Sequence, residues 1–428
     1  MLDWDDPLGN LGNKKANEKQ INSLSESYAL SGVLNKTRHN NGDNSANKFI
    51  SDAVDNSVDN LIKTTAKVDT DSTRISSQAM LSLAEEQDNI ERSIDPVKAS
   101  DKRVINGLAD VNQLAPFKYP WAWEYFLNAN KNHWTPLDIN MAQDVHDYQH
   151  TLTENEKHVY ENVLAYLTTS DILAMRNIGL AVMEKMTAPE LQIYQARQVY
   201  EEALHTWTYQ HCIETIGLDQ SEIYNRYRVV PEINAKIQLA NRRLNSVMRN
   251  DIDLTNPAEL NNFVMAYAFF AGIFEGCWFY NGFTPIFSLQ RRGLMKGTSE
   301  QLQYIMRDEV MHASFGIRVV KQIMLENEVQ LDPIAIREMW DESEAVEIGY
   351  ANYLLGKNPI LGYSADDHIE QFRFIANRRA RQLGFEEPFP GAENRSPWLD
   401  EQANMRKEKN FFETRVTEYQ TGGALSWD

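Results

Sequence analysis

Apolar residues recur with the period of an α-helix through most of the chain, and the segments that show this pattern are long. Polar residues that cap helices mark where these segments begin. Thr153 is followed three residues later by Glu156, the spacing of a capping box, and Asn256 and Asp332 each precede a proline suited to a first helical turn. Helices are therefore expected to start at Thr153, Thr187, Asn256, Thr298, Asp332 and Ser364. Long helices joined by loops, with no alternation of strand and helix, predict an all-α bundle.

Two polar segments flank this helical region. Residues 1–95 are rich in Asn, Ser, Asp and Lys and contain few aromatic residues, so they can bury little apolar surface and are expected to be flexible. Residues 391–428 are polar, with weak periodicity, and are expected to form a C-terminal tail. The sequence therefore predicts one helical domain at 96–390, between a flexible N-terminal extension and a tail. Within the extension, residues 75–94 carry a pattern that could form an isolated helix.

Charge and composition narrow the function classes. The formal net charge is −19, and such a surface repels phosphate backbones, so no direct nucleic-acid partner is expected. Cys212 and Cys277 have no CxxC spacing, so neither a disulfide framework nor a cysteine-type zinc site is expected. The first residues, MLDWDDPLGN, are acidic, and Glu275 interrupts the most apolar segment, residues 263–283, so neither a signal peptide nor a membrane span is expected. We therefore expect a cytoplasmic protein.

Two motifs share the pattern Glu-x-x-His. Glu202 and His205 lie in VYEEALHTWTYQH, and Glu309 and His312 lie in IMRDEVMHASFG. Because residues i and i+3 lie on the same face of a helix, each motif points a carboxylate and an imidazole in the same direction. A single Glu-x-x-His often arises by chance in helices. Two of them, each preceded by a helix with an acid in an apolar stretch, are a specific signal.

Those two acids are Asp171, in LAYLTTSDILAM, and Glu275, in AFFAGIFEGCWFY. An ionised carboxylate in such surroundings is strongly unfavourable unless it is paired. Two divalent cations would neutralise four inward carboxylates, and two histidines complete a ligand set that suits iron or manganese better than structural zinc. The order acid, Glu-x-x-His, acid, Glu-x-x-His is the general ligand pattern of ferritin-like di-metal bundles, with Asp in place of the first Glu. The alternative is that both motif glutamates are surface charges and both histidines are satisfied core polar groups.

From Asp101 onward the chain resembles the small subunit of class I ribonucleotide reductase. The resemblance rests on the segments DKRVINGLADVNQLAPFKYPWAWEYF, YEEALHTWTYQ, MRDEVMHASFG and FFETRVTEYQTGGALSWD. It covers about the last three quarters of the chain, and the motifs are specific in combination. It implies a ferritin-like helical bundle whose di-metal site activates O2 and generates a stable tyrosyl radical. A large catalytic subunit would use that radical to reduce ribonucleotides to deoxyribonucleotides.

The resemblance also implies a role for individual residues around the metals. The implied ligands are Asp171, Glu202 and His205 for one ion and Glu275, Glu309 and His312 for the other. Tyr209, one turn after His205, matches the radical tyrosine, whereas a close subgroup has Phe there and uses a mixed Mn/Fe centre. Phe279, Phe283 and Ile305 match apolar residues around that tyrosine, which keep water and reductants away from a radical.

Further residues match a radical relay to the large subunit. Trp134 matches a tryptophan near the metal site, Asp308 an acid that links it to His205, and Tyr419 a tyrosine in the tail. The tail, residues 391–428, is expected to bind the large subunit. Because the family forms homodimers, a homodimer is expected here too.

The cofactor and the exact function leave alternatives open. Two iron ions are expected, but the ligand types also permit Mn/Mn or Mn/Fe. The same fold could serve a ferritin-like di-iron oxidase or monooxygenase that acts on a bound organic substrate, a metal-storage protein or a purely structural bundle. The oxidase would need neither the tail motif nor a relay at Trp134.

Overall fold

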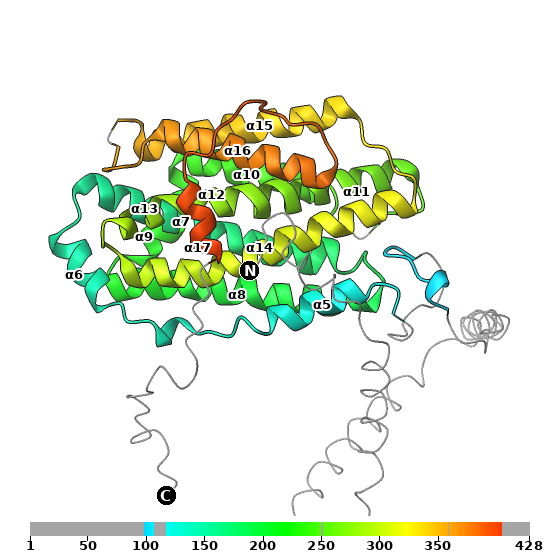
Figure 1. Cartoon of the computed structure of the whole chain (residues 1–428), viewed down its shortest axis with the longest axis horizontal. Coiled ribbons are helices and arrows are strands. Elements are labelled where there is room, and N and C mark those ends of the chain that lie inside the picture. The colour runs from blue at the N-terminus through cyan, green and yellow to red at the C-terminus, as the bar shows by residue number, and fades with distance from the viewer. Residues whose placement is uncertain (1–97, 107–116, 250, 358, 405–428) are drawn as a thin grey trace, which may run out of the picture. The chain divides into compact units, whose positions relative to one another are not determined.

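The computed structural model describes residues 98–106, 117–249, 251–357 and 359–404, and these residues are mainly helical (Figure 1). All of them belong to a single unit of the chain. The predicted extension at 1–95, the isolated helix considered within it, the last part of the tail and Tyr419 lie outside the described residues. Across the described ranges, extended pairing is limited to one β-bridge between Ile360 and Tyr363. The all-α fold predicted from the sequence is confirmed.

The helices follow one another along the chain with short connections. The α-helices are α5 (Pro120–Ala129), α6 (Ala142–His150), α7 (Glu154–Asn177), α8 (Pro189–Ile216), α9 (Gln220–Val229), α10 (Pro231–Asn245), α11 (Pro257–Phe269), α12 (Tyr280–Gly282), α13 (Thr284–Arg291), α14 (Lys296–Glu326), α15 (Pro333–Ala351), α16 (Ala365–Leu383) and α17 (Pro397–Asn404). Wider π-helical segments are η3 (Ile178–Val182), η4 (Phe270–Phe279) and η5 (Asn352–Gly356), and short 3₁₀ turns are η1 (Ala99–Asp101) and η2 (Pro136–Asp138).

Most of the predicted helix starts are confirmed. The Thr153 hydroxyl accepts a hydrogen bond from the backbone N–H of Glu156 at 3.3 Å, completing the predicted capping box of α7. Asn256 and Asp332 cap α11 and α15, and Ser364 caps α16. These caps are local in sequence, which is why the pattern predicts them.

Two predicted starts are wrong, one by one residue and the other by three. The helix α8 follows Ala188, because the Thr187 hydroxyl accepts a hydrogen bond from the backbone N–H of Asn106 at 2.9 Å instead of capping the helix. The helix α14 begins at Lys296 rather than after Thr298, because a carboxylate from α6 satisfies its first N–H groups. Asp144 accepts hydrogen bonds from the backbone N–H groups of Gly297 at 2.8 Å and of Thr298 at 2.6 Å. A cap supplied by another helix leaves no local sequence signal.

The most apolar segment is a core helix. The run Pro257–Arg291 has the length and composition of a membrane span, but 94% of its most apolar window is buried inside the protein. Its central part, η4, is wound as a π-helix, a form that often marks functional sites. A Cβ atom added at Gly316 of α14 would lie 2.5 Å from the Cβ of Ala271, so α14 and η4 pack too closely for a side chain there.

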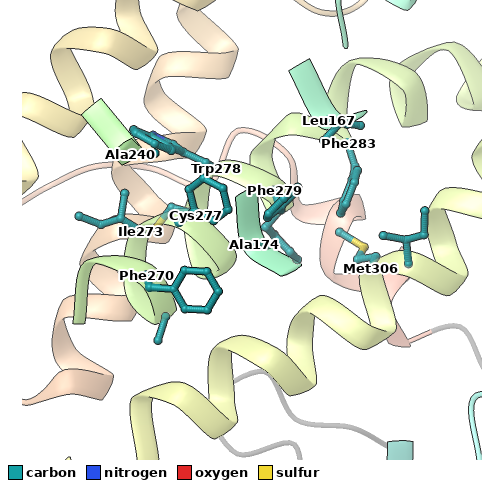
Figure 2. Close-up of a cluster of buried hydrophobic side chains, with 14 of the residues drawn as sticks. Leu167, Ala174, Ala240, Phe270, Ile273, Cys277, Trp278, Phe279, Phe283 and Met306 are labelled. Carbon is teal, nitrogen blue, oxygen red and sulfur yellow. The ribbon is translucent and has the colours of Figure 1, made fainter. Parts of the chain in front are cut away.

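The centre of the bundle lies between α7, α8, η4 and α14. The helix α7 packs against α8, and η4 packs against both α14 and α16, while α15 and α16 lie side by side (Figure 1). Figure 2 shows part of the apolar core, in which Phe270, Ile273, Cys277 and Trp278 of η4 lie together, with Ala240 of α10 beside Trp278. Four helices that face one centre can each direct side chains to a common point.

Part of the segment 391–404, which lies within the predicted tail at 391–428, packs on the helical domain. Leu399 is fully buried, and the Asp400 carboxylate accepts hydrogen bonds from Tyr280 at 3.0 Å and from Arg378 at 3.2 Å. The helix α17 is short and mostly polar, so its periodicity is too weak to distinguish it from a tail. The part of the chain that packs on the domain therefore includes Leu399 and Asp400.

Candidate metal centre

The carboxylates and histidines singled out by the sequence converge at the centre of the bundle. Asp171 comes from α7, Glu202 and His205 from α8, Glu275 from η4, and Glu309 and His312 from α14. Each of these side chains is at most 1% exposed. Two groups with ligand atoms within 4.8 Å of one another are found among the described residues: Asp171, Glu202 and His205, and Glu202, Glu275, Glu309 and His312. The geometry thus brings together the whole predicted set.

Glu202 and Glu309 lie between the two histidines. Glu202 has one oxygen 3.5 Å from His205 Nδ1 and the other 3.0 Å from His312 Nδ1. Glu309 has one oxygen 3.2 Å from His205 Nδ1 and the other 3.5 Å from His312 Nδ1. Asp171 approaches only the first histidine, at 3.8 Å, and Glu275 only the second, at 3.7 Å. This arrangement has two terminal acids and two acids positioned to bridge a pair of ions.

The electrostatics of the cluster require positive charge. Burial and the neighbouring carboxylates raise the pKa of Asp171 and of Glu275 well above the ordinary range. Both oxygens of Asp171, Glu202, Glu275 and Glu309, and Nδ1 of both histidines, have no hydrogen-bond partner within the described part of the chain. Buried carboxylates without partners are unfavourable, and cations bound between them would satisfy all of these atoms. The residues present therefore fit a pair of divalent metal ions.

Tyr209 lies in α8 one turn beyond His205. It is fully buried, and its hydroxyl has no hydrogen-bond partner in the described ranges. Burial raises the pKa of Tyr209 well above the usual value, and the charge of Asp171 adds to this effect. The phenol is therefore held neutral beside the carboxylate cluster.

The predicted apolar residues around this tyrosine are all fully buried. Phe279 lies four residues after Glu275, and Ile305 lies four residues before Glu309, so both are one helical turn from a proposed ligand. Figure 2 shows Phe279 and Phe283 grouped with Leu167 and Met306. The sequence did not single out these last two residues, because nothing distinguishes them from ordinary core positions. These residues are all fully buried and belong to the apolar core.

The predicted relay residues are only partly connected. One oxygen of Asp308 lies 3.1 Å from His205 Nε2, and the other accepts a hydrogen bond from Asn132 at 2.6 Å. Trp134 is buried and stacks on Tyr304 with ring centroids 5.4 Å apart, but its indole N–H has no hydrogen-bond partner among the described residues. Asp308 therefore reaches His205 as predicted, while Asn132 rather than Trp134 forms the bond on its far side.

Known proteins share both the sequence and the fold. Residues 111–397 match the family model described as ribonucleotide reductase, small chain. The ribonucleoside-diphosphate reductase subunit beta of Chlamydia pneumoniae is 38% identical over 350 residues, which cover 80% of this chain and 100% of that protein. The ribonucleotide reductase R2 subunit from Clostridium botulinum has a TM-score of 0.63 at 23% identity, covering 71% of this chain and 94% of that chain. A dimanganese(II) protein from Streptococcus sanguinis has a TM-score of 0.55 at 18% identity, covering 70% and 99%.

The family match and the buried cluster agree with each other. The match includes every proposed metal ligand, and the ligands meet at one point although they come from segments far apart in the sequence. The buried cluster could hold metal ions, and the chain belongs to the ribonucleotide reductase small-chain family.

Proposed function

We propose that Tyr209 carries the radical in this chain and that six side chains hold the two metal ions beside it. The proposed ligands are Asp171, Glu202, His205, Glu275, Glu309 and His312. As the small subunit of a ribonucleoside-diphosphate reductase, the chain is the radical-generating part of an oxidoreductase that works with a large subunit. The observation that carries the residue assignment is Tyr209 itself, fully buried one turn from His205 with a neutral phenol.

In this proposal the residues of the chain bind the metal ions, fix the orientation of the ligand side chains and shield Tyr209 from water. Two metal ions bound here would supply the oxidation of Tyr209 by O2. The carboxylates of Asp171, Glu202, Glu275 and Glu309 would hold the ions, and the imidazoles of His205 and His312 would complete their ligand sets. Phe279, Phe283 and Ile305 are fully buried, and we propose that they exclude water from Tyr209. A dry pocket protects a radical, because neither water nor reductants can reach it.

We propose iron for both metal positions. Carboxylate and imidazole ligands suit iron and manganese alike, so the ligand set also accepts Mn/Mn or Mn/Fe. The dimanganese(II) protein from Streptococcus sanguinis shares the fold. Elemental analysis of the protein purified from its own cells decides between these pairs.

We propose that the oxidising equivalent passes through Asp308 and Trp134 and reaches the large subunit by way of Tyr419. Asp308 is bonded to His205, and Asn132, two residues from Trp134, is bonded to Asp308, which supports a connection between the cluster and this segment. We further propose that the tail, residues 391–428, binds the large subunit. Leu399 and Asp400 of α17 already contact the helical domain, so the test removes residues that follow α17. Removal of residues 411–428 should abolish binding to the large subunit and leave the radical yield unchanged; unchanged binding would contradict the proposal.

We propose that the chain forms a homodimer through α7, η3 and α8. Large apolar side chains are exposed on these adjoining elements, namely Ile172, Leu180, Tyr200 and Trp207. Large apolar side chains exposed on neighbouring helices fit an interface. Light scattering should give the mass of a dimer, and Trp207→Glu should shift it toward the monomer. A monomer at micromolar concentration would contradict this proposal.

The domain boundaries at 95 and 390 and the cytoplasmic location stay predictions.

The decisive experiment is reconstitution with Fe(II) and O2, followed by EPR spectroscopy. The wild-type protein should give a tyrosyl radical signal, and Tyr209→Phe should bind the same amount of metal and give no such signal. Tyr194→Phe is a matched control, because Tyr194 is also a fully buried tyrosine of α8 with an unbonded hydroxyl among the described residues. A radical signal that survives in Tyr209→Phe would overturn the assignment. The family match does not favour the oxidase that acts on an organic substrate.

A further inference from the structure

Glu201 is a buried acid of α8 that directly precedes the proposed metal ligand Glu202. Its side chain is 1% exposed, and both of its oxygens are bonded. One oxygen lies 2.9 Å from His312 Nε2, and the other accepts a hydrogen bond from Arg197 Nε at 2.8 Å. The proposed ligand acids differ in this respect, because their oxygens lack such partners among the described residues. Glu201 therefore contacts His312 at Nε2, the ring nitrogen that points away from the cluster. It does not itself face the cluster.

The position of Glu201 mirrors that of Asp308. Glu201 in α8 contacts Nε2 of His312 in α14, and Asp308 in α14 contacts Nε2 of His205 in α8 at 3.1 Å. Each acid directly precedes the glutamate of its own Glu-x-x-His motif. The two motifs are therefore acid-Glu-x-x-His, and each helix supplies the acid that contacts the histidine of the other helix.

This contact determines which nitrogen of the ring is free to bind a metal ion. A neutral imidazole carries one N–H, and a carboxylate at Nε2 favours the tautomer with the proton there. The lone pair of Nδ1 then points into the cluster, where Nδ1 of His312 lies 3.0 Å from Glu202 and 3.7 Å from Glu275. A carboxylate in this position also makes the imidazole a stronger ligand.

Glu201 and Asp308, which we call the backing acids because each contacts Nε2 of a ligand histidine, have different neighbours. Glu201 is paired with the guanidinium of Arg197, which also lies over the ring of Tyr200 at 4.8 Å from its centroid. Asp308 is held instead by the neutral amide of Asn132. The His312 half of the centre therefore has a permanent cation behind its backing acid, and the His205 half has none at the corresponding hydrogen bond.

We propose that Glu201 is a positioning residue, which fixes the ring and the Nδ1 tautomer of His312 for metal binding, and that Arg197 holds its carboxylate in place. The inference rests on the proposed function, because it requires His312 to be a metal ligand. It extends that function by adding a residue that the ligand pattern alone does not contain. A purely structural ion pair would stabilise the fold without changing the properties of one metal position relative to the other.

The test compares Glu201→Gln with Asp308→Asn, the matched change behind the other histidine. Metal-free protein is titrated with Mn(II), and the Co(II)-loaded protein is examined by NMR for the exchangeable imidazole N–H protons shifted by the metal. Wild-type protein should bind two ions. Glu201→Gln should weaken one of them by about 10- to 100-fold, the usual effect of losing such a partner. It should also move the His312 N–H signal and leave the His205 signal in place, and Asp308→Asn should show the opposite pattern.

Further variants separate positioning from folding. Glu201→Ala should weaken the same ion more than Glu201→Gln does, because the amide can still accept the imidazole N–H. If Glu201 variants fold poorly, Arg197→Gln changes a partly exposed partner and should shift the same N–H signal in the same direction by a smaller amount. Two bound ions with wild-type affinities and unshifted N–H signals in Glu201→Gln would overturn the inference alone. Fewer than two ions bound by the wild-type chain would overturn the proposed function and this inference with it.

Discussion

Glu347→Gln should destabilise the helical domain strongly, because Glu347 is the buried acid that joins several helices. Its carboxylate lies 2.6 Å from Lys236 Nζ of α10 and 2.8 Å from His368 Nε2 of α16, and it accepts a hydrogen bond from Asn281 of α12 at 3.0 Å. Glu347 and its charged partner Lys236 are both fully buried. The substitution removes the negative charge and leaves the ammonium without its ion-pair partner.

The surroundings of Lys236 limit how far the protein can adapt. The ammonium lies over the rings of Tyr166 at 3.9 Å, Tyr350 at 4.6 Å and Trp278 at 5.0 Å from the ring centroids. These rings attract the cation but cannot replace an anion. Breaking a buried pair by removing one charge costs about 3–5 kcal/mol. The rings still attract the ammonium, so we expect a loss at the lower end of this range, about 3 kcal/mol in the free energy of unfolding.

The pH dependence of the effect has a definite sign. The charge of Lys236 and the bond from His368 outweigh the effect of burial and lower the pKa of Glu347 to about 2. The unfolded chain has the ordinary glutamate value of about 4.3. A lowered pKa contributes stability that is fully present above the unfolded value and is lost as pH falls toward the folded value. The difference between wild-type protein and Glu347→Gln should therefore be constant near neutral pH and should shrink between about pH 4.3 and pH 2.

The assay is chemical denaturation of the metal-free protein, with Glu342→Gln as the control. Glu342 is on the same helix, is 44% exposed and pairs with Arg243 at 2.7 Å, so its loss should cost no more than about 1 kcal/mol. If both variants lost the same small amount of stability at pH 7, the argument that burial makes the Glu347 network strong would be refuted. A difference that grew on acidification would refute the sign of the linkage.

Three further predictions concern the site and its supports. Asp144→Ala should cost about 1–2 kcal/mol in denaturation experiments, because it removes the cap from the first N–H groups of α14. Gly316→Ala should cost about 1–3 kcal/mol by forcing α14 away from Ala271, and metal affinity measured by titration should fall with it. Glu275→Gln should abolish full metal occupancy, measured by elemental analysis, and should raise the melting temperature of the metal-free protein. The reason is that it removes a buried acid whose oxygens have no partner among the described residues.

The sequence predicts helix caps and ligand motifs correctly where the contacts that form them are between residues close together in the chain. The capping boxes at Thr153 and Ser364 were readable because donor and acceptor are three residues apart. The Glu-x-x-His motifs were readable for the same reason, since one helical turn brings both side chains to one face. Glu275 was identified because a carboxylate stands out in an apolar stretch.

The contacts between helices could not be predicted from such patterns. The α14 cap joins Asp144 to Thr298, which are 154 positions apart. Trp134 was expected to meet Asp308, but the structure bonds Asn132 to that carboxylate, because the choice depends on how a loop packs against α14. The π-helical winding of η4 also has no distinct residue pattern, since the segment is uniformly apolar apart from Glu275.

Glu201 lies between these two cases. The sequence does place an acid directly before the glutamate of both motifs. In a helix rich in acids, however, such a neighbour does not by itself indicate a contact with a histidine. Its partner His312 is 111 positions away, and the pairing of Asp308 with His205 spans 103 positions. The two contacts are reciprocal, since each helix supplies the acid that contacts the histidine of the other. Both contacts can therefore form only when α8 and α14 lie in one register. A displacement of one helix along the other by a single residue would move both backing acids away from both histidines at once. The repeated acid before each Glu-x-x-His therefore fixes the register of the helix pair, and with it the convergence of the carboxylates on which metal binding depends.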